Sequence, residues 1–138
     1  MKKVMSSESK SMPKMYILVN MDLSLGKGKI AGQVGHVVRR MTSFYYDSYE
    51  LMKTSEEATI SFTKLDRLWD EWLTNGETKI VLKSNEKQMR EFELSEKRNF
   101  PFAIYDAGRT QIPAGSFTAL GFFPSYDLEA KLNDLKLL

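Results

Sequence analysis

A stripe of polar side chains follows a glycine–lysine turn early in the chain. The turn Gly26–Lys29 reads Gly-Lys-Gly-Lys, and Gln33, His36 and Arg40 come after it at helical spacing. Because an α-helix advances about 100° per residue, Lys29 and these three side chains fall within about 60° of one another. An ammonium group, an amide and an imidazole would then face one ligand, and a neutral imidazole is suited to general-base catalysis.

The same segment is rich in positive charge. It runs from Asp22 to Asp47 with no acidic residue between them and four basic residues that could face an anion: Lys27, Lys29, Arg39 and Arg40. Backbone N–H groups at a helix N-terminus add to the attraction. Phosphate is the natural ligand for such a surface, although the four-residue spacer and the Ser/Thr of a P-loop are missing.

A second polar cluster, Asp106–Gln111, follows a predicted strand, and in open α/β sheets ligands bind at such positions. Asp106 can accept hydrogen bonds or pair with a cation, and Arg109 can bind a phosphate or carboxylate through two hydrogen bonds. Thr110 and Gln111 can orient water or a carbonyl. The alternative for this segment alone is a capped turn with a solvated arginine. If the strands that precede the two clusters are parallel neighbours, the clusters meet at one edge of the sheet.

Three glycines lie beside the polar stripe, at Gly28, Gly32 and Gly35. A glycine inside a helix costs about 1 kcal/mol relative to alanine, so their presence suggests a steric reason. Either another backbone of the protein packs against them, or a bulky ligand approaches the helix closely.

Hydrophobic periodicity predicts the elements that position these residues. The expected strands span 15–22, 79–83, 101–106 and 117–123, and the expected helices span 29 to the low 50s, 61–75, 86–98 and 126–134, the last capped by Ser125. The first helix should face the sheet with Ile30, Val34, Val37, Met41 and Phe44. The order strand–helix–helix–strand–helix–strand–strand–helix predicts an α/β fold, a single domain with a mixed four-stranded β-sheet flanked by helices on both faces.

Composition sets further limits. A chain of 138 residues suits one domain, which we place at 13–138 after a disordered polar tail at 1–12. The absence of cysteine and the single histidine exclude disulfides, thiol nucleophiles and Cys- or His-rich metal sites. No apolar run reaches the length of a membrane span, and the polar N-terminus does not suit a secretory signal. Trp69 and Trp72 are expected in the core or at a dimer surface.

Together these segments resemble the type 2 peptidyl-tRNA hydrolases of archaea and eukaryotes, from about Lys14 to Leu138. The most specific matches are Asp22–His36 and Asp106–Ile112, supported by Lys79–Lys83, Thr118–Gly121 and Leu135–Leu138. The chain departs from the family at Asn20, where an arginine is usual, and at Val37 and Val38, where alanines are usual. The segment 46–63 also differs.

The resemblance implies hydrolysis of the ester that joins a peptide to the 3′ ribose of tRNA, without a metal or other cofactor, in the cytoplasm. It also implies a mixed four-stranded sheet, often in a homodimer. The family's catalytic residues match Lys29, His36, Asp106 and Thr110, with Gln33 and Thr118 nearby. A catalytically silent RNA- or protein-binding module on the same fold is the alternative.

We expect a water molecule to attack the ester carbonyl, with His36 or Asp106 accepting its proton. Lys29, together with a backbone N–H or Thr110, would stabilise the oxyanion. The remaining residues would hold the tRNA backbone and its 3′ end: Lys27, Gln33, Arg39, Arg40, Arg109, Gln111 and Thr118.

Overall fold

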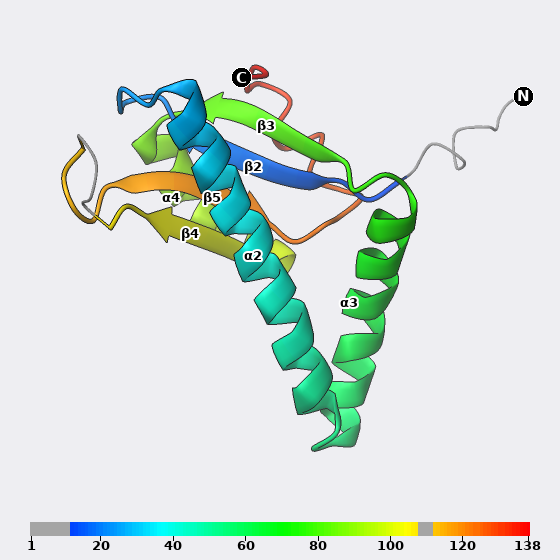
Figure 1. Cartoon of the computed structure of the whole chain (residues 1–138). Coiled ribbons are helices and arrows are strands. Elements are labelled where there is room, and N and C mark those ends of the chain that lie inside the picture. Colours follow the sequence, from blue (N-terminus) through cyan, green and yellow to red (C-terminus); the bar gives the residue numbers. More distant parts are fainter. Residues whose placement is uncertain (1–11, 108–111) are drawn as a thin grey trace, which may run out of the picture.

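The computed structural model describes residues 12–107 and 112–138, and Figure 1 shows their arrangement. Four strands and three helices form in these residues: β2 (Met15–Asn20), α2 (Lys27–Met52), α3 (Glu56–Thr74), β3 (Lys79–Ser84), α4 (Glu86–Ser95), β4 (Pro101–Tyr105) and β5 (Phe117–Phe122). A short 3₁₀ helix, η1 (Lys97–Asn99), follows α4. The tail predicted at 1–12 lies outside the described residues, apart from Met12.

The strands form one mixed sheet in the order β3-β2-β5-β4. β2 pairs with β3 in parallel, and β5 pairs antiparallel with β2 and with β4. The predicted α/β fold with a mixed four-stranded sheet is confirmed. The strands that precede the two polar clusters are not neighbours, however, because β5 lies between β2 and β4. β2 and β4 nevertheless run in the same direction, so their carboxyl ends lie at the same edge of the sheet. Helix α2 crosses the sheet in front of them (Figure 1).

Helices and turns bury both faces of the sheet. On one face Val37 and Met41 of α2 are fully buried with Ile17 of β2. This core also contains Trp69 and Trp72 of α3, which places the two tryptophans in the interior. On the other face Leu18, Met89, Leu120, Leu128 and Leu132 form a second core. Alternate residues of a strand point to opposite faces, which is why neighbouring residues such as Ile17 and Leu18 enter different cores.

Helix α2 packs on the sheet at unusually close range. A Cβ atom added to Gly121 of β5 would lie 2.2 Å from Cγ1 of Val37, so glycine is required there. The glycines of α2 behave differently, because Cβ atoms added to Gly28, Gly32 or Gly35 would meet nothing within 4 Å. Close backbone packing of the described residues against these three glycines, one of the two explanations considered, is therefore wrong.

Two helix boundaries differ from the prediction by three residues or more. Helix α3 begins at Glu56 instead of Ser61, because the hydroxyl of Ser55 accepts a hydrogen bond from the N–H of Ala58 and caps it. Helix α4 ends at Ser95 instead of Arg98, and η1 follows it. At its start, Asn85 and Gln88 form a reciprocal capping box, and the carboxylate of Asp22 accepts a further bond from the N–H of Glu86.

The helix predicted at 126–134 is wrong, because the segment forms a series of turns. Its apolar residues do enter the second core, with Leu128 and Leu132 buried. Both ends of the segment are fixed by strand-like pairing: Ser125 bonds through its backbone to Lys14, and Leu137 forms a bridge with Leu82. A helix this short is marginal by itself, so these contacts decide its conformation. The hydroxyl of Ser125 is buried and caps nothing.

The last residues of the chain run along the outer edge of β3. The N–H of Lys83 donates to the carbonyl of Lys136, and the N–H of Leu138 donates to that of Val81. In the described ranges, no helix has the length and apolar character that crossing a bilayer requires.

Candidate active site

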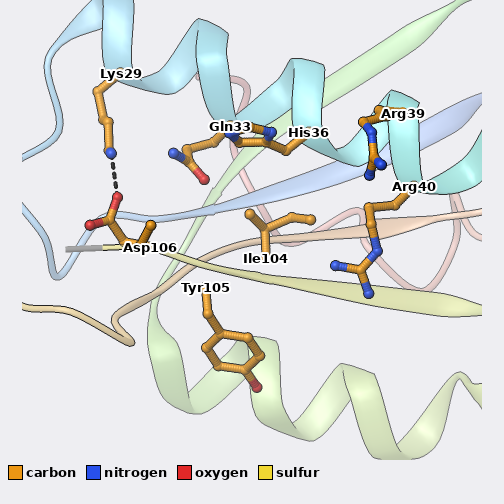
Figure 2. A pocket seen from close by; sticks show the side chains of 9 residues that line it. Lys29, Gln33, His36, Arg39, Arg40, Ile104, Tyr105 and Asp106 are labelled. Atoms are coloured by element: carbon orange, nitrogen blue, oxygen red, sulfur yellow. Dashed lines mark hydrogen bonds and ion pairs between the residues drawn. The ribbon is translucent and has the colours of Figure 1, made fainter. Parts of the chain in front are cut away.

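An open cavity of about 310 Å³ lies between the first half of α2 and the end of β4 (Figure 2). Its walls come from two parts of the chain far apart in sequence. The lining residues are Lys29, Gln33, His36, Arg39, Arg40, Ile104, Tyr105, Asp106 and Ala107. All four members of the stripe predicted on the first helix line it, and Asp106 of the second cluster faces them.

An ion pair joins the two clusters at one end of the cavity. The ammonium group of Lys29, in the first turn of α2, bonds to a carboxylate oxygen of Asp106 just after β4 (Figure 2). The side chain of Asp106 is 3% exposed, whereas that of Lys29 is 22% exposed. A buried carboxylate requires a partner of this kind, since transfer of a charge out of water is costly. The pair thus places an acid–base group and a cation beside one another.

The floor of the cavity is a buried polar contact between α2 and β5. Gln33 and Thr118 are almost completely buried, and the hydroxyl of Thr118 lies 2.8 Å from Oε1 of Gln33. The same hydroxyl lies 3.1 Å from the carbonyl oxygen of Ile104. A hydroxyl has one proton to donate, so these two oxygens share it and Gln33 is held in place. Thr118 therefore lies beneath the cavity and orients one of its walls.

The solvent side of the cavity is basic. His36, Arg39 and Arg40 are exposed and line it. The guanidinium carbon of Arg40 lies 5.7 Å from the centre of the Phe102 ring, which supports the side chain from below. Lys27 is exposed at the first residue of α2 but does not line the cavity.

The turn that leads into α2 depends on Asn20, the position at which the resemblance predicts arginine. Asn20 is fully buried at the end of β2. Its amide donates a hydrogen bond of 2.8 Å to the carbonyl of Phe117, and its Oδ1 accepts one of 2.9 Å from the N–H of Asp22. These bonds connect the end of β2 to the start of β5. In this chain the residue has a structural role and does not line the cavity.

Three predicted site residues lie outside the described residues: Arg109, Thr110 and Gln111. Sequence reasoning missed Ile104, Tyr105 and Ala107 as lining residues. Tyr105 carried a usable signal, because it is an aromatic residue directly before Asp106 at the end of a strand. Ile104 and Ala107 carried none apart from their position.

The described side chains could hold an anion and polarise a carbonyl, and a carboxylate and an imidazole could each accept a proton from water. Among them, no group of three or more His, Asp or Glu residues could hold a metal ion. The cavity is therefore suited to hydrolysis of an ester or a related acyl compound that carries negative charge nearby.

Most of the chain is similar to proteins of one known family. Residues 13–138 match the family model described as peptidyl-tRNA hydrolase PTH2. A peptidyl-tRNA hydrolase of Saccharolobus solfataricus is 34% identical over 132 residues, which are 92% of this chain and all of that protein. A peptidyl-tRNA hydrolase of Sulfurisphaera tokodaii is 36% identical over 134 residues, which are 91% of this chain and 98% of that protein.

Proposed function

The chain belongs to the peptidyl-tRNA hydrolase PTH2 family and hydrolyses peptidyl-tRNA, and from that premise we propose that the cavity between α2 and β4 is its active site. The observation that carries this proposal is the ion pair of Lys29 with Asp106, which joins the two motifs inside the cavity. The silent binding module considered above is not favoured, because the family and its relatives are hydrolases.

In the proposed mechanism, Asp106 accepts a proton from the water molecule that attacks the ester carbonyl. Its place in the cavity beside Lys29 supports this role, since a general base must lie within hydrogen-bonding reach of the attacking water. The proton then passes to the departing ribose oxygen, so that a free peptide carboxylate and a free 3′ end result. His36 is the alternative base, although it stands on the exposed side of the cavity.

Lys29 stabilises the oxyanion that forms on the carbonyl oxygen. Its ammonium group already lies at the carboxylate of Asp106, so it can donate to the carbonyl oxygen while Asp106 accepts from the attacking water beside it. Gln33 fixes the orientation of the acyl group from the floor, where Thr118 holds it. We include Thr110 as a further oxyanion donor on the strength of the family resemblance.

The basic solvent side of the cavity, here called the basic rim, holds the phosphates of the tRNA 3′ end. Arg39 and Arg40 are exposed beside the ester site, and Lys27 lies at the start of the same helix. Phosphates contacted by arginine and lysine release bound counterions, so affinity falls as salt rises. Arg109 and Gln111 join this set by resemblance. The proposal also includes a cytoplasmic location and the possibility of a homodimer.

Hydrolysis of N-acetyl-aminoacyl-tRNA tests the catalytic roles. Asp106→Asn should lower kcat by about 10²- to 10⁴-fold, whereas Asp70→Asn, a matched change on the exposed side of α3, should leave it unaltered. His36→Ala should lower kcat less than tenfold. If His36→Ala loses as much as Asp106→Asn, the histidine is the base and our assignment is reversed.

The salt dependence of tRNA binding tests the basic rim. Each of Arg39→Gln and Arg40→Gln should reduce the slope of log affinity against log salt by about one. Arg67→Gln removes an exposed arginine of α3 that lies outside the cavity and should keep the wild-type slope. Equal slopes in all the variants would refute phosphate contacts at the rim.

A further inference from the structure

Tyr105 is an exposed aromatic residue directly before Asp106. It is 49% exposed and is one of the residues that line the cavity. Its side chain extends from β4 away from α2 (Figure 2). Since β4 is at the end of the strand order, no described strand covers its outer edge. A ligand held at Asp106 can therefore pass over this edge and reach the Tyr105 ring.

The Tyr105 ring is fixed from behind by two neighbours. Phe117 of β5 is buried, and its ring centre lies 5.1 Å from that of Tyr105 at an angle of 30°. Arg90 of α4 places its guanidinium carbon 4.9 Å from the centre of the Phe117 ring and is itself held by Glu86 through an ion pair of 2.9 Å. Hydrogen bonding to Glu86 and to Tyr105 raises the pKa of Arg90. Tyr105 thus presents a supported aromatic face to solvent.

We propose that this face stacks on the 3′-terminal adenine of the tRNA, an inference that rests on the proposed function. The reacting ester is attached to the ribose of that nucleotide, so its base is always one sugar ring away from the ester that reacts at Asp106. Peptide side chains differ from one substrate to the next, whereas this base is the same in every tRNA. A fixed aromatic ring can contact this base in every substrate, whereas it would fit only some peptide side chains. Stacking of a base on an aromatic side chain is strong for any base.

Paired substrates test the platform. One is N-acetyl-aminoacyl-tRNA with its normal 3′-terminal adenosine, and the other carries the same ester on a terminal ribose that lacks the base. With the wild-type enzyme, loss of the base should lower kcat/KM by about 5- to 150-fold, mainly through a higher KM. In Tyr105→Ala the two substrates should become nearly equal, whereas Tyr105→Phe should keep the wild-type ratio.

Two further variants separate stacking from structural effects. Tyr105→Leu still covers Phe117 but lacks an aromatic face, so its ratio should also approach one. Tyr46→Ala removes a 59% exposed tyrosine from the distal half of α2 and should keep the wild-type ratio. A wild-type ratio in Tyr105→Ala or Tyr105→Leu overturns the inference. If these variants instead change the preference among substrates with different amino acids in the ester, the ring contacts the peptide, and this result would overturn the inference as well.

A binding measurement keeps this inference separate from the enzyme's activity. A tRNA that ends in 2-aminopurine should lose fluorescence on binding to the wild type and to Tyr105→Phe, because stacking quenches this base. It should keep its fluorescence with Tyr105→Leu. Tyr105-dependent quenching together with full hydrolysis by Asp106→Asn would retain the platform and refute the proposed active site. Loss of hydrolysis in Asp106→Asn without Tyr105-dependent quenching in the wild type would retain the active site and refute the platform.

Discussion

Replacement of Gly121 by alanine should destabilise the protein through Val37. The added Cβ atom would lie 2.2 Å from Cγ1 of Val37, more than about 1 Å short of ordinary van der Waals contact. A valine in a helix has one strongly preferred rotamer, so its methyl group cannot rotate away and α2 must move off the sheet. Overpacking of this kind costs about 1–3 kcal/mol. For a domain of this size, the melting temperature should fall by about 4–12 °C.

A double-mutant cycle identifies the contact. Val37→Ala alone should destabilise the protein because it leaves a cavity, yet it removes the methyl group that Gly121→Ala meets. The double variant should therefore be more stable than the sum of the two losses predicts, by about 1 kcal/mol or more. The relief stays partial because Cβ of Val37 lies 3.3 Å from the added atom. Chemical denaturation monitored by circular dichroism measures all four proteins.

Gly32→Ala is the matched control, because it makes the same substitution in open space on α2. It should raise the free energy of unfolding by up to about 1 kcal/mol, since alanine favours a helix over glycine. A Gly121→Ala variant that melts with the wild type would refute the reasoning. Strict additivity in the cycle would show that Val37 is not the limiting contact.

Three further predictions concern polar groups. Thr118→Val keeps the side-chain volume but leaves the amide of Gln33 without its buried partner, so unfolding free energy should fall by about 1–3 kcal/mol and kcat should fall with it. Asn20→Asp replaces a buried donor by a carboxylate that faces a carbonyl, and should lower the urea midpoint more than Asn20→Ala does. Burial and a 2.6 Å hydrogen bond to a carboxylate on α3 raise the pKa of Tyr45 to about 12. The folded state thus keeps the phenol proton longer than the unfolded state, so this stabilisation is complete below pH 10 and is lost as the pH rises to about 12. Tyr45→Phe should show a shallower loss of stability in that window.

Periodicity was sufficient for most of the fold. The four strands and the first three helices lie close to their predicted positions, because their apolar residues recur at a period that matches the element. The failure at 126–134 has a local cause. Leu128 and Leu132 have helical spacing, but the pairing of Ser125 with Lys14 and of Leu137 with Leu82 fixes the segment at both ends. No pattern within the segment reports such distant contacts.

The candidate site was predictable in part. The stripe on α2 follows from helical geometry, and the position of Asp106 at a strand end follows from the general location of ligand sites in α/β sheets. The strand order was not predictable, because insertion of β5 between β2 and β4 is a property of the whole sheet. Burial of Gln33 was also missed, since its partner Thr118 lies 85 residues away in the chain.

The two edges of the sheet differ in their capacity for self-association. The outer edge of β3 is occupied by the residues up to Leu138, which take the place of a fifth strand. The outer edge of β4 has no strand beside it among the described residues, and this edge borders the cavity. An exposed edge of this kind is where one sheet can add to another and begin aggregation. If the 3′-terminal nucleotide crosses this edge as proposed, substrate and a second copy of the sheet compete for it, and bound tRNA should slow aggregation.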